Sequence, residues 1–183
     1  MRLQSRIAVD LLTFWFDEHG QGDWFRGGEA FDDKIRERFG ALYEAHLGGA
    51  ASDHLATPVT ALAAILLFDQ VPRNLFRDDA RACATDPLAR AIAEGVMERD
   101  WEERLTAEGR QFAYLPFMHS EDLADQDRSV ALFEGLGNDE ATEFARKHRD
   151  AIARFGRFPH RNEALGRETR PQEREAVREG ADW

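Results

Sequence analysis

The residues best suited to chemistry fall into three short blocks, and the first block directly follows the most apolar stretch of the chain. It consists of Asp69, Gln70, Val71, Pro72, Arg73 and Asn74. A carboxylate at the edge of a core must be ion-paired or protonated, and Arg73 and Arg77 are the nearest cations in sequence. The block therefore predicts either a structural ion pair, with Asn74 shaping the end of a helix, or an Arg73 side chain that faces a ligand.

The second block, residues 114–126, places a histidine beside a serine and several acidic residues. His119, Ser120 and Glu121 do not form a catalytic triad merely by being adjacent, because a triad is a spatial arrangement. Ser120 is predicted to cap a helix that begins at Glu121, where the helix dipole favours acidic residues. Capping and the dipole account for Ser120 and Glu121 but leave His119 without a structural role, so His119 is a candidate for binding or catalysis. Glu121 remains a candidate base if the protein is an enzyme.

The third block, residues 154–163, alternates arginine with aromatic residues. Arg154, Arg157 and Arg161 would repel one another unless acidic groups or an anionic ligand lay among them. The acidic groups would come from the first two blocks. His160 and Asn162 complete the polar set of this block.

The remaining chemically active residues give weaker signals. His148 lies within an apolar stripe, which indicates either a hydrogen-bonded core histidine or a member of the same site. A metal site would require histidines to converge with the acidic residues of the first two blocks, and the sequence contains no HExxH motif and no two histidines four residues apart. We predict no metal and no cofactor. Cys83, in an alanine-rich segment, is predicted to be an unreactive part of the core.

The composition predicts one globular domain spanning residues 1–183. The chain is 43% hydrophobic with 13 Phe and four Trp, which suffices for one core and excludes intrinsic disorder. The single cysteine excludes a disulfide framework. Neither a signal peptide nor an apolar run long enough for a bilayer is recognised, so we predict a cytoplasmic protein.

The charge is distributed unevenly along the chain. The net charge is −11, yet residues 146–170 contain eight basic and only three acidic residues. This basic segment predicts either internal ion pairing with the acidic remainder or an anion site. A protein of this net charge repels polyphosphates and anionic lipids, so neither a nucleic acid nor a membrane is predicted as a partner.

Helical periodicity runs through the whole chain, and no segment shows sustained strand-like alternation. We expect an all-α fold of eight or nine helices packed as antiparallel pairs. Thr57 and Pro58 open the most apolar helix, which should lie at the centre and end at Pro72. The expected helices cover residues 6–17, 31–47, 58–71, 86–97, 102–114, 122–134 and 139–155, then a short helix from residue 162 and a last one opened by a capping box at 169–172, with a connection at 19–28.

Four motifs make the chain similar to a known family. They are FWF at 14–16, DQVPRNLFR at 69–77, YLPFMHSEDLADQ at 114–126 and RFGRFPHRNEALGRE at 154–168. With these motifs the chain resembles the mainly bacterial family catalogued as domain of unknown function 924. The resemblance implies a tetratricopeptide-like superhelical arrangement, here without consensus repeats, and it implies no activity and no catalytic residues. Residues 168–173 depart from the family's usual start of the last helix.

Three interpretations of the blocks remain open. The first is a binding protein whose polar Arg/His/Asp pocket takes an anionic small molecule or an acidic peptide. The second is a small hydrolase or lyase in which Asp69 or Glu121 acts with His119 or His160 on an anionic substrate. The third is a purely structural network, with a protein–protein interaction surface elsewhere. The candidate ligand-binding residues are Asp69, Gln70, Arg73, Asn74, His119, Glu121, His148, Arg157, His160, Arg161 and Asn162.

Overall fold

The computed structural model describes residues 2–178, and regular structure within that range is entirely helical. A π-helical turn joins α4 to α5 without a break, so these two segments form one helix and the described chain has nine. The all-α fold of eight or nine helices is therefore confirmed. The helices are α1 (Ser5–Leu12), α2 (Gln21–Arg26), α3 (Glu29–His46), α4 (Pro58–Ile65), α5 (Val71–Leu75), α6 (Asp86–Met97), α7 (Ala107–Met118), α8 (Leu123–Leu136), α9 (Asp139–Phe155) and α10 (Pro171–Arg178).

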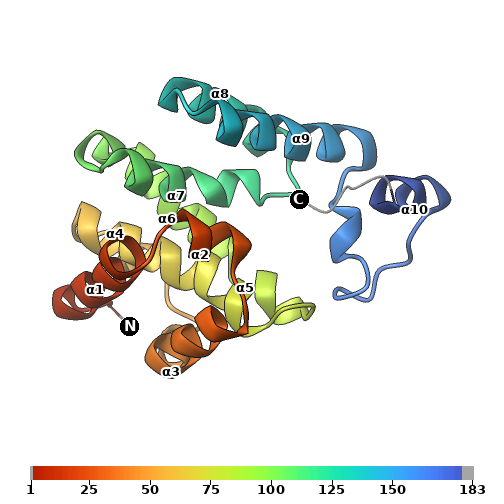
Figure 1. The fold of residues 1–183 in the computed structure, drawn as a ribbon. Coiled ribbons are helices and arrows are strands. Elements are labelled where there is room, and N and C mark those ends of the chain that lie inside the picture. Colours follow the sequence, from red (N-terminus) through yellow and green to blue (C-terminus); the bar gives the residue numbers. More distant parts are fainter. Residues whose placement is uncertain (1, 179–183) are drawn as a thin grey trace.

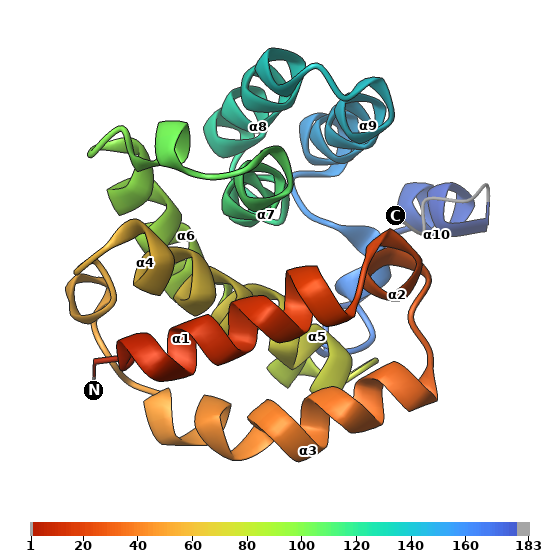
Figure 2. The same cartoon turned by 60° about the vertical axis from the view of Figure 1, so that its left-hand side comes forward.

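The helices are arranged around the continuous helix α4–α5. Helices α1, α3, α6 and α7 all contact it, while α8 packs between α7 and α9. Figures 1 and 2 show α7, α8 and α9 as one layer above the layer of α1 and α3, with α10 at one edge. The tetratricopeptide-like superhelical arrangement stays a prediction. No helix within residues 2–178 is both long and apolar enough to cross a membrane.

The central helix begins as its sequence predicts but ends differently. The Thr57 hydroxyl accepts a hydrogen bond from the Thr60 amide at 3.1 Å, and every residue from 60 to 72 is buried. The expectation that Pro72 ends this helix is wrong, because the helix runs on to Leu75. Proline cannot donate the backbone hydrogen bond of a regular helix, and the wider π-helical turn Leu66–Gln70 precedes it. This turn carries Asp69 and Gln70 of the first block.

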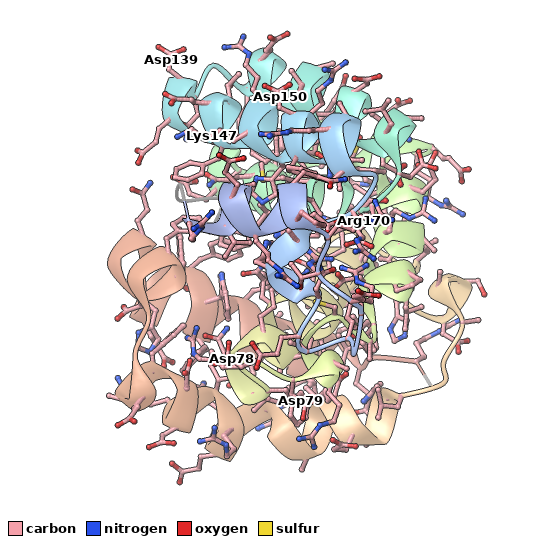
Figure 3. All side chains as sticks on the ribbon, turned by 90° about the vertical axis from the view of Figure 1, so that its right-hand side faces the viewer. Asp78, Asp79, Asp139, Lys147, Asp150 and Arg170 are labelled. Atoms are coloured by element: carbon pink, nitrogen blue, oxygen red, sulfur yellow. The ribbon has the colours of Figure 1, made fainter. Side chains whose placement is uncertain are left out.

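Helix α9 matches its predicted boundaries. The Asn138 side chain accepts from the Ala141 amide at 3.1 Å, and Gly156 ends the helix with a φ of +70°. Its inner face buries His148, Ile152 and Phe155, as the apolar stripe predicts. Phe144, assigned to the same stripe, is instead 44% exposed. Figure 3 shows Asp139, Lys147 and Asp150 on the outer side of this helix.

Other boundaries differ from the sequence predictions. The expected connection at 19–28 contains α2, and the helix expected from residue 102 begins at Ala107 and continues through Pro116 to Met118. Residues after Asn162 form turns rather than a short helix. Asp122, not Ser120, caps α8, because its carboxylate accepts from the Ala124 amide at 2.8 Å. The last helix begins at Pro171, two residues after the Thr169 expected to cap it.

The two glycines at the end of α8 provide a matched test of its C-terminus. Gly135 lies inside the helix, where an added methyl group would meet open space, whereas Gly137 ends the helix with a φ of +71°. Gly135→Ala should raise the free energy of unfolding by roughly 0.5–1 kcal/mol. Gly137→Ala should lower it by about 1–2 kcal/mol, because a side chain is disfavoured in the left-handed region. Urea denaturation measures both, and two effects of the same sign would contradict this assignment.

Candidate functional site

A buried carboxylate–imidazole pair joins the first and second blocks. Asp69 lies on the π-helical turn and is fully buried, and His119 follows the last residue of α7. The Nδ1 atom of His119 lies 2.8 Å from Oδ1 of Asp69, while the Gln70 amide donates to Oδ2 at 2.6 Å. The interior position of Asp69 therefore depends on partners from two helices.

Arg73 connects this pair to α6. Its guanidinium donates two hydrogen bonds to Asp86, at 2.8 and 2.9 Å, and lies 3.3 Å from Oδ1 of Asp69. It also donates to the backbone carbonyl of Asp69. Burial alone would raise the pKa of the Asp69 carboxyl, but Arg73 and His119 outweigh burial and hold it well below its ordinary range. Asp69 is thus ionised at neutral pH.

The third block contributes Arg161 to the same cluster. Its Nη1 atom donates to the His119 carbonyl at 3.1 Å and lies 3.5 Å from Oδ2 of Asp86. The guanidinium also stacks over the Phe158 ring, 4.6 Å from its centroid. Desolvation lowers the pKa of Arg161 from its ordinary value. We call Asp69, Arg73, Asp86, His119 and Arg161 the His119 cluster.

Two further histidines border the His119 cluster. The ring of His148 lies 6.5 Å from that of His119 and 5.4 Å from that of Phe158, measured between centroids. Burial lowers the pKa of His148 to about 3, and its Nδ1 atom donates to the Phe144 carbonyl at 2.9 Å. His160 is exposed, with its ring 5.6 Å from Phe158. These residues surround the cluster on the side of α9.

Arg157 and Asn162 lie in a separate cluster at α10. Glu173 is fully buried and accepts two hydrogen bonds from Arg157, both at 2.8 Å. The same carboxylate accepts from the Asn162 amide at 3.1 Å and from the Arg170 backbone amide at 2.7 Å. We call Arg157, Asn162, Arg170 and Glu173 the Glu173 cluster, whose Arg170 is labelled beside α10 in Figure 3. The structure therefore does not bring Arg157 and Asn162 together with His119.

Glu121 fastens the third block to the start of α8. Its carboxylate accepts from the Phe158 amide at 2.7 Å and from Arg167 at 2.7 and 3.0 Å. Burial raises the pKa of Glu121, but Arg167 and the Phe158 amide lower it by more, and the net shift is downward. These contacts hold Phe158 beneath the Arg161 guanidinium.

Asn74 of the first block binds within its own helix, whereas Arg77, three residues later, binds another helix. The Asn74 amide donates to the Gln70 carbonyl at 2.9 Å, which is the helix-shaping role that the sequence predicts. Arg77 does not pair with Asp69, contrary to one expectation. It binds Asp32 of α3 at 2.5 and 2.7 Å, and so joins two helices instead.

The basic segment 146–170 is extensively ion-paired. Arg146 binds Glu134, Arg149 binds Asp127, and Arg157 and Arg167 bind the buried or half-buried glutamates described above. Internal pairing therefore accounts for much of this segment. Among the acidic partners of this segment in the described residues, only Glu121 belongs to the first two blocks, contrary to expectation.

Asp86 is the member of the His119 cluster that sequence reasoning missed. Together with Pro87 it has the pattern of a helix start, although its carboxylate binds Arg73. Its position thirteen residues after Arg73 gives no sequence signal for this pairing. Cys83 is half-buried near Arg161, and burial raises the pKa of its thiol.

The His119 cluster coincides neither with a metal-binding arrangement nor with the open hollow found on α3. Among residues 2–178, no group of three or more His, Cys, Asp or Glu side chains is arranged to hold a metal ion. An open hollow of about 440 Å³ lies between α3 and the π-helical segment Thr13–Glu18 that follows α1. It is lined by Phe14, Glu18, His19, Lys34, Glu37 and Arg38.

Comparison with known proteins gives a consistent assignment. A family model described as "Bacterial protein of unknown function (DUF924)" matches residues 11–181. The chain is also similar to the structure of the protein of unknown function ATU0120 from Agrobacterium tumefaciens, with 41% sequence identity and a TM-score of 0.90 over 96% of this chain and 99% of that one. No curated protein matches the chain. The chain therefore belongs to the bacterial DUF924 family.

Proposed function

We propose that the chain is a binding protein for a small anion, such as a phosphate or a carboxylate, held at the His119 cluster. The observation that supports this proposal is the unused hydrogen-bonding capacity of Arg161. Its Nη1 atom makes both of the polar contacts described above, while Nε and Nη2 are not buried and have no acceptor within residues 2–178. A guanidinium with spare donors favours an oxyanion ligand.

The charges within the His119 cluster also favour Arg161 as the residue that binds the anion. Two arginines face two aspartates, but Asp86 lies much closer to Arg73 than to Arg161. Asp69 also faces Arg73 and not Arg161. Arg161 is thus the less neutralised cation of the two, and an added anion would complete its charge balance.

The low exposure of the His119 cluster favours a small ligand over the acidic peptide. The Arg161 side chain is 12% exposed and the His119 side chain is 14% exposed. Side chains exposed to this small extent can contact an anionic group of a few atoms, whereas a peptide backbone needs a longer groove.

Isothermal titration calorimetry with inorganic phosphate and with acetate tests the proposal. Arg161→Gln should weaken binding by roughly 10- to 100-fold, since a charged hydrogen bond contributes about 1.5–3 kcal/mol. Arg154→Gln is the matched control, because Arg154 is exposed on α9 and contacts only the Phe155 ring among described residues. Binding that is equal in wild type and Arg161→Gln, or no binding of either anion to wild type, would refute the proposal and leave a structural role for the cluster.

The Asp69–His119 pair supports a second candidate, acid–base catalysis on an anionic substrate. A carboxylate that orients an imidazole is the arrangement used by general bases. Hydrolysis of the anionic ester 4-nitrophenyl phosphate by wild type, lost in His119→Gln, would favour this candidate. Turnover that persists in His119→Gln would exclude His119 as the base.

A further inference from the structure

The hydrogen bond to Asp69 determines which nitrogen of His119 carries the proton. The Asp69 carboxylate is ionised, so it can only accept, and Nδ1 of His119 must be the donor in their 2.8 Å contact. Burial and the nearby Arg73 lower the pKa of His119, which leaves the ring neutral near pH 7. In a neutral imidazole with Nδ1 protonated, Nε2 is an acceptor.

The Nε2 atom is available to a ligand. It has no hydrogen-bond partner in the part of the chain that the structure describes, and it is not among the buried unpartnered atoms. The guanidinium of Arg161 is held against the backbone carbonyl of this same histidine. Arg161 therefore lies beside His119, and a ligand bound between the two side chains would meet donors from Arg161 and an acceptor from His119.

We infer that this site selects anions that carry a hydrogen-bond donor of their own, so that phosphate binds and sulfate is rejected. Phosphate near pH 7 retains at least one proton and can place an O–H group on Nε2 of His119 while its charged oxygens face Arg161. Sulfate has lost both protons and would direct an oxygen lone pair at the Nε2 lone pair. The inference rests on the proposed function and narrows its ligand class for the same site from phosphate or carboxylate to phosphate, because an ionised carboxylate also lacks a donor.

The charged neighbours maintain this selectivity near neutral pH. Asp69 of the π-helical turn accepts the hydrogen bond of the Nδ1 proton, while burial and Arg73 of α5 oppose a second proton on the ring. Arg161 of the Pro159–Arg161 turn donates to the backbone carbonyl of His119. Asp86 of α6 favours that second proton but is already bound to Arg73. His148 of α9 and His160 of the same turn complete the titratable surroundings.

The expected preference for phosphate over sulfate follows from the cost of leaving Nε2 of His119 without a hydrogen-bond donor. A binding site built around a donor–acceptor pair rejects a ligand that lacks the matching group far more strongly than it rejects a small change in size. Leaving a polar group unpaired costs about 1–3 kcal/mol, which corresponds to roughly 5- to 150-fold in affinity. We expect phosphate to bind at least about 5-fold more tightly than sulfate.

Calorimetric titrations of the whole protein with sodium phosphate and sodium sulfate, at pH 7 and equal ionic strength, test the inference. His119→Gln replaces the acceptor with an amide that can also donate, so it should bring the two affinities to within a few-fold while Arg161 still binds both anions. Near-ultraviolet circular dichroism verifies that this variant is folded. If it is not folded, lowering the pH of wild type provides the second test, because protonated Nε2 becomes a donor and sulfate binding should strengthen relative to phosphate.

The outcomes separate the inference from the proposed function. Sulfate binding as tightly as phosphate at pH 7, in an Arg161-dependent way, would overturn the inference and leave the anion site intact. A preference for phosphate that is unchanged in folded His119→Gln would also overturn it. If neither anion binds wild type, the proposed function fails and the inference fails with it.

Discussion

Replacing Asp69 by alanine is expected to lower the free energy of unfolding by about 3–5 kcal/mol, the range found when one partner of a buried ion pair is removed. Asp69 is fully buried, and it accepts hydrogen bonds from His119 and Gln70 while facing Arg73. The substitution leaves those three donors around a cavity without their acceptor. Urea denaturation at pH 7 measures the loss.

Two control variants show how much of this stability loss is due to the charge of Asp69. One keeps the shape of the side chain, and the other removes an exposed ion pair. Asp69→Asn keeps one acceptor oxygen for His119 and should cost less than Asp69→Ala. Asp10→Ala removes a carboxylate that is 51% exposed and pairs with Arg38, and it should cost less than about 1 kcal/mol. A loss for Asp69→Ala no larger than that for Asp10→Ala would show that the cluster does not stabilise the fold.

The same carboxylate makes stability depend on acidic pH in a defined direction. The pKa of Asp69 is depressed in the folded protein, so its stabilising contribution is present above its unfolded pKa of about 3.9. That contribution is lost as the pH falls from there toward the folded-state value. Asp69→Asn should therefore flatten the stability curve below about pH 4.

The buried histidines should make the protein lose stability at a higher pH than the aspartate does. Burial lowers the pKa of His148 to about 3 from its ordinary 6.5. A histidine with a depressed folded-state pKa binds its proton more readily in the unfolded chain, so stability falls as the pH drops below 6.5 and continues to fall until the folded-state pKa is reached. Between pH 7 and 5, His148 alone should remove about 2 kcal/mol.

Measuring unfolding of His148→Gln at both pH values tests this prediction. Glutamine can donate to the Phe144 carbonyl as His148 does, but it does not titrate, so the difference between pH 7 and 5 should shrink by about 2 kcal/mol. Stability of that variant should still fall somewhat in acid, because fully buried His54 is unchanged and its pKa is also lowered by burial. An unchanged pH dependence would show that His148 is not protonated on unfolding in this range.

Sequence periodicity predicts most of the helices because each buries one apolar face. The residues at both ends of α9, Asn138 and Gly156, have local capping roles that need no tertiary information. Helix α2 escaped prediction because its six residues depend on distant partners. Trp24 donates to the Trp15 carbonyl at 2.8 Å and packs 5.1 Å from the Phe112 ring.

The composition of the candidate site was only partly predictable for a similar reason. Asp69, Arg73, His119 and Arg161 all belong to the three blocks, and burial of Asp69 follows from its place after an apolar helix. Arg157 and Arg161 differ by only four positions, yet the turn between them directs one toward Glu173 and the other toward Asp86. Tertiary packing decides which acidic group each arginine binds, so the spacing of the arginines in the sequence cannot predict it.

The anchoring of Arg161 through the Glu173 cluster imposes an order on biosynthesis. Arg157 and Asn162, which flank Arg161, are both held by a glutamate that the ribosome adds eleven residues after Asn162. A nascent chain that has not reached Glu173 can already join Asp69, Arg73, Asp86 and His119, but it lacks the anchor for the third block. Phe158, fully buried in the finished protein, would then lack the part of its apolar cover that Ala176 of α10 supplies. The third block can thus reach its final arrangement only after the α10 segment has been synthesised.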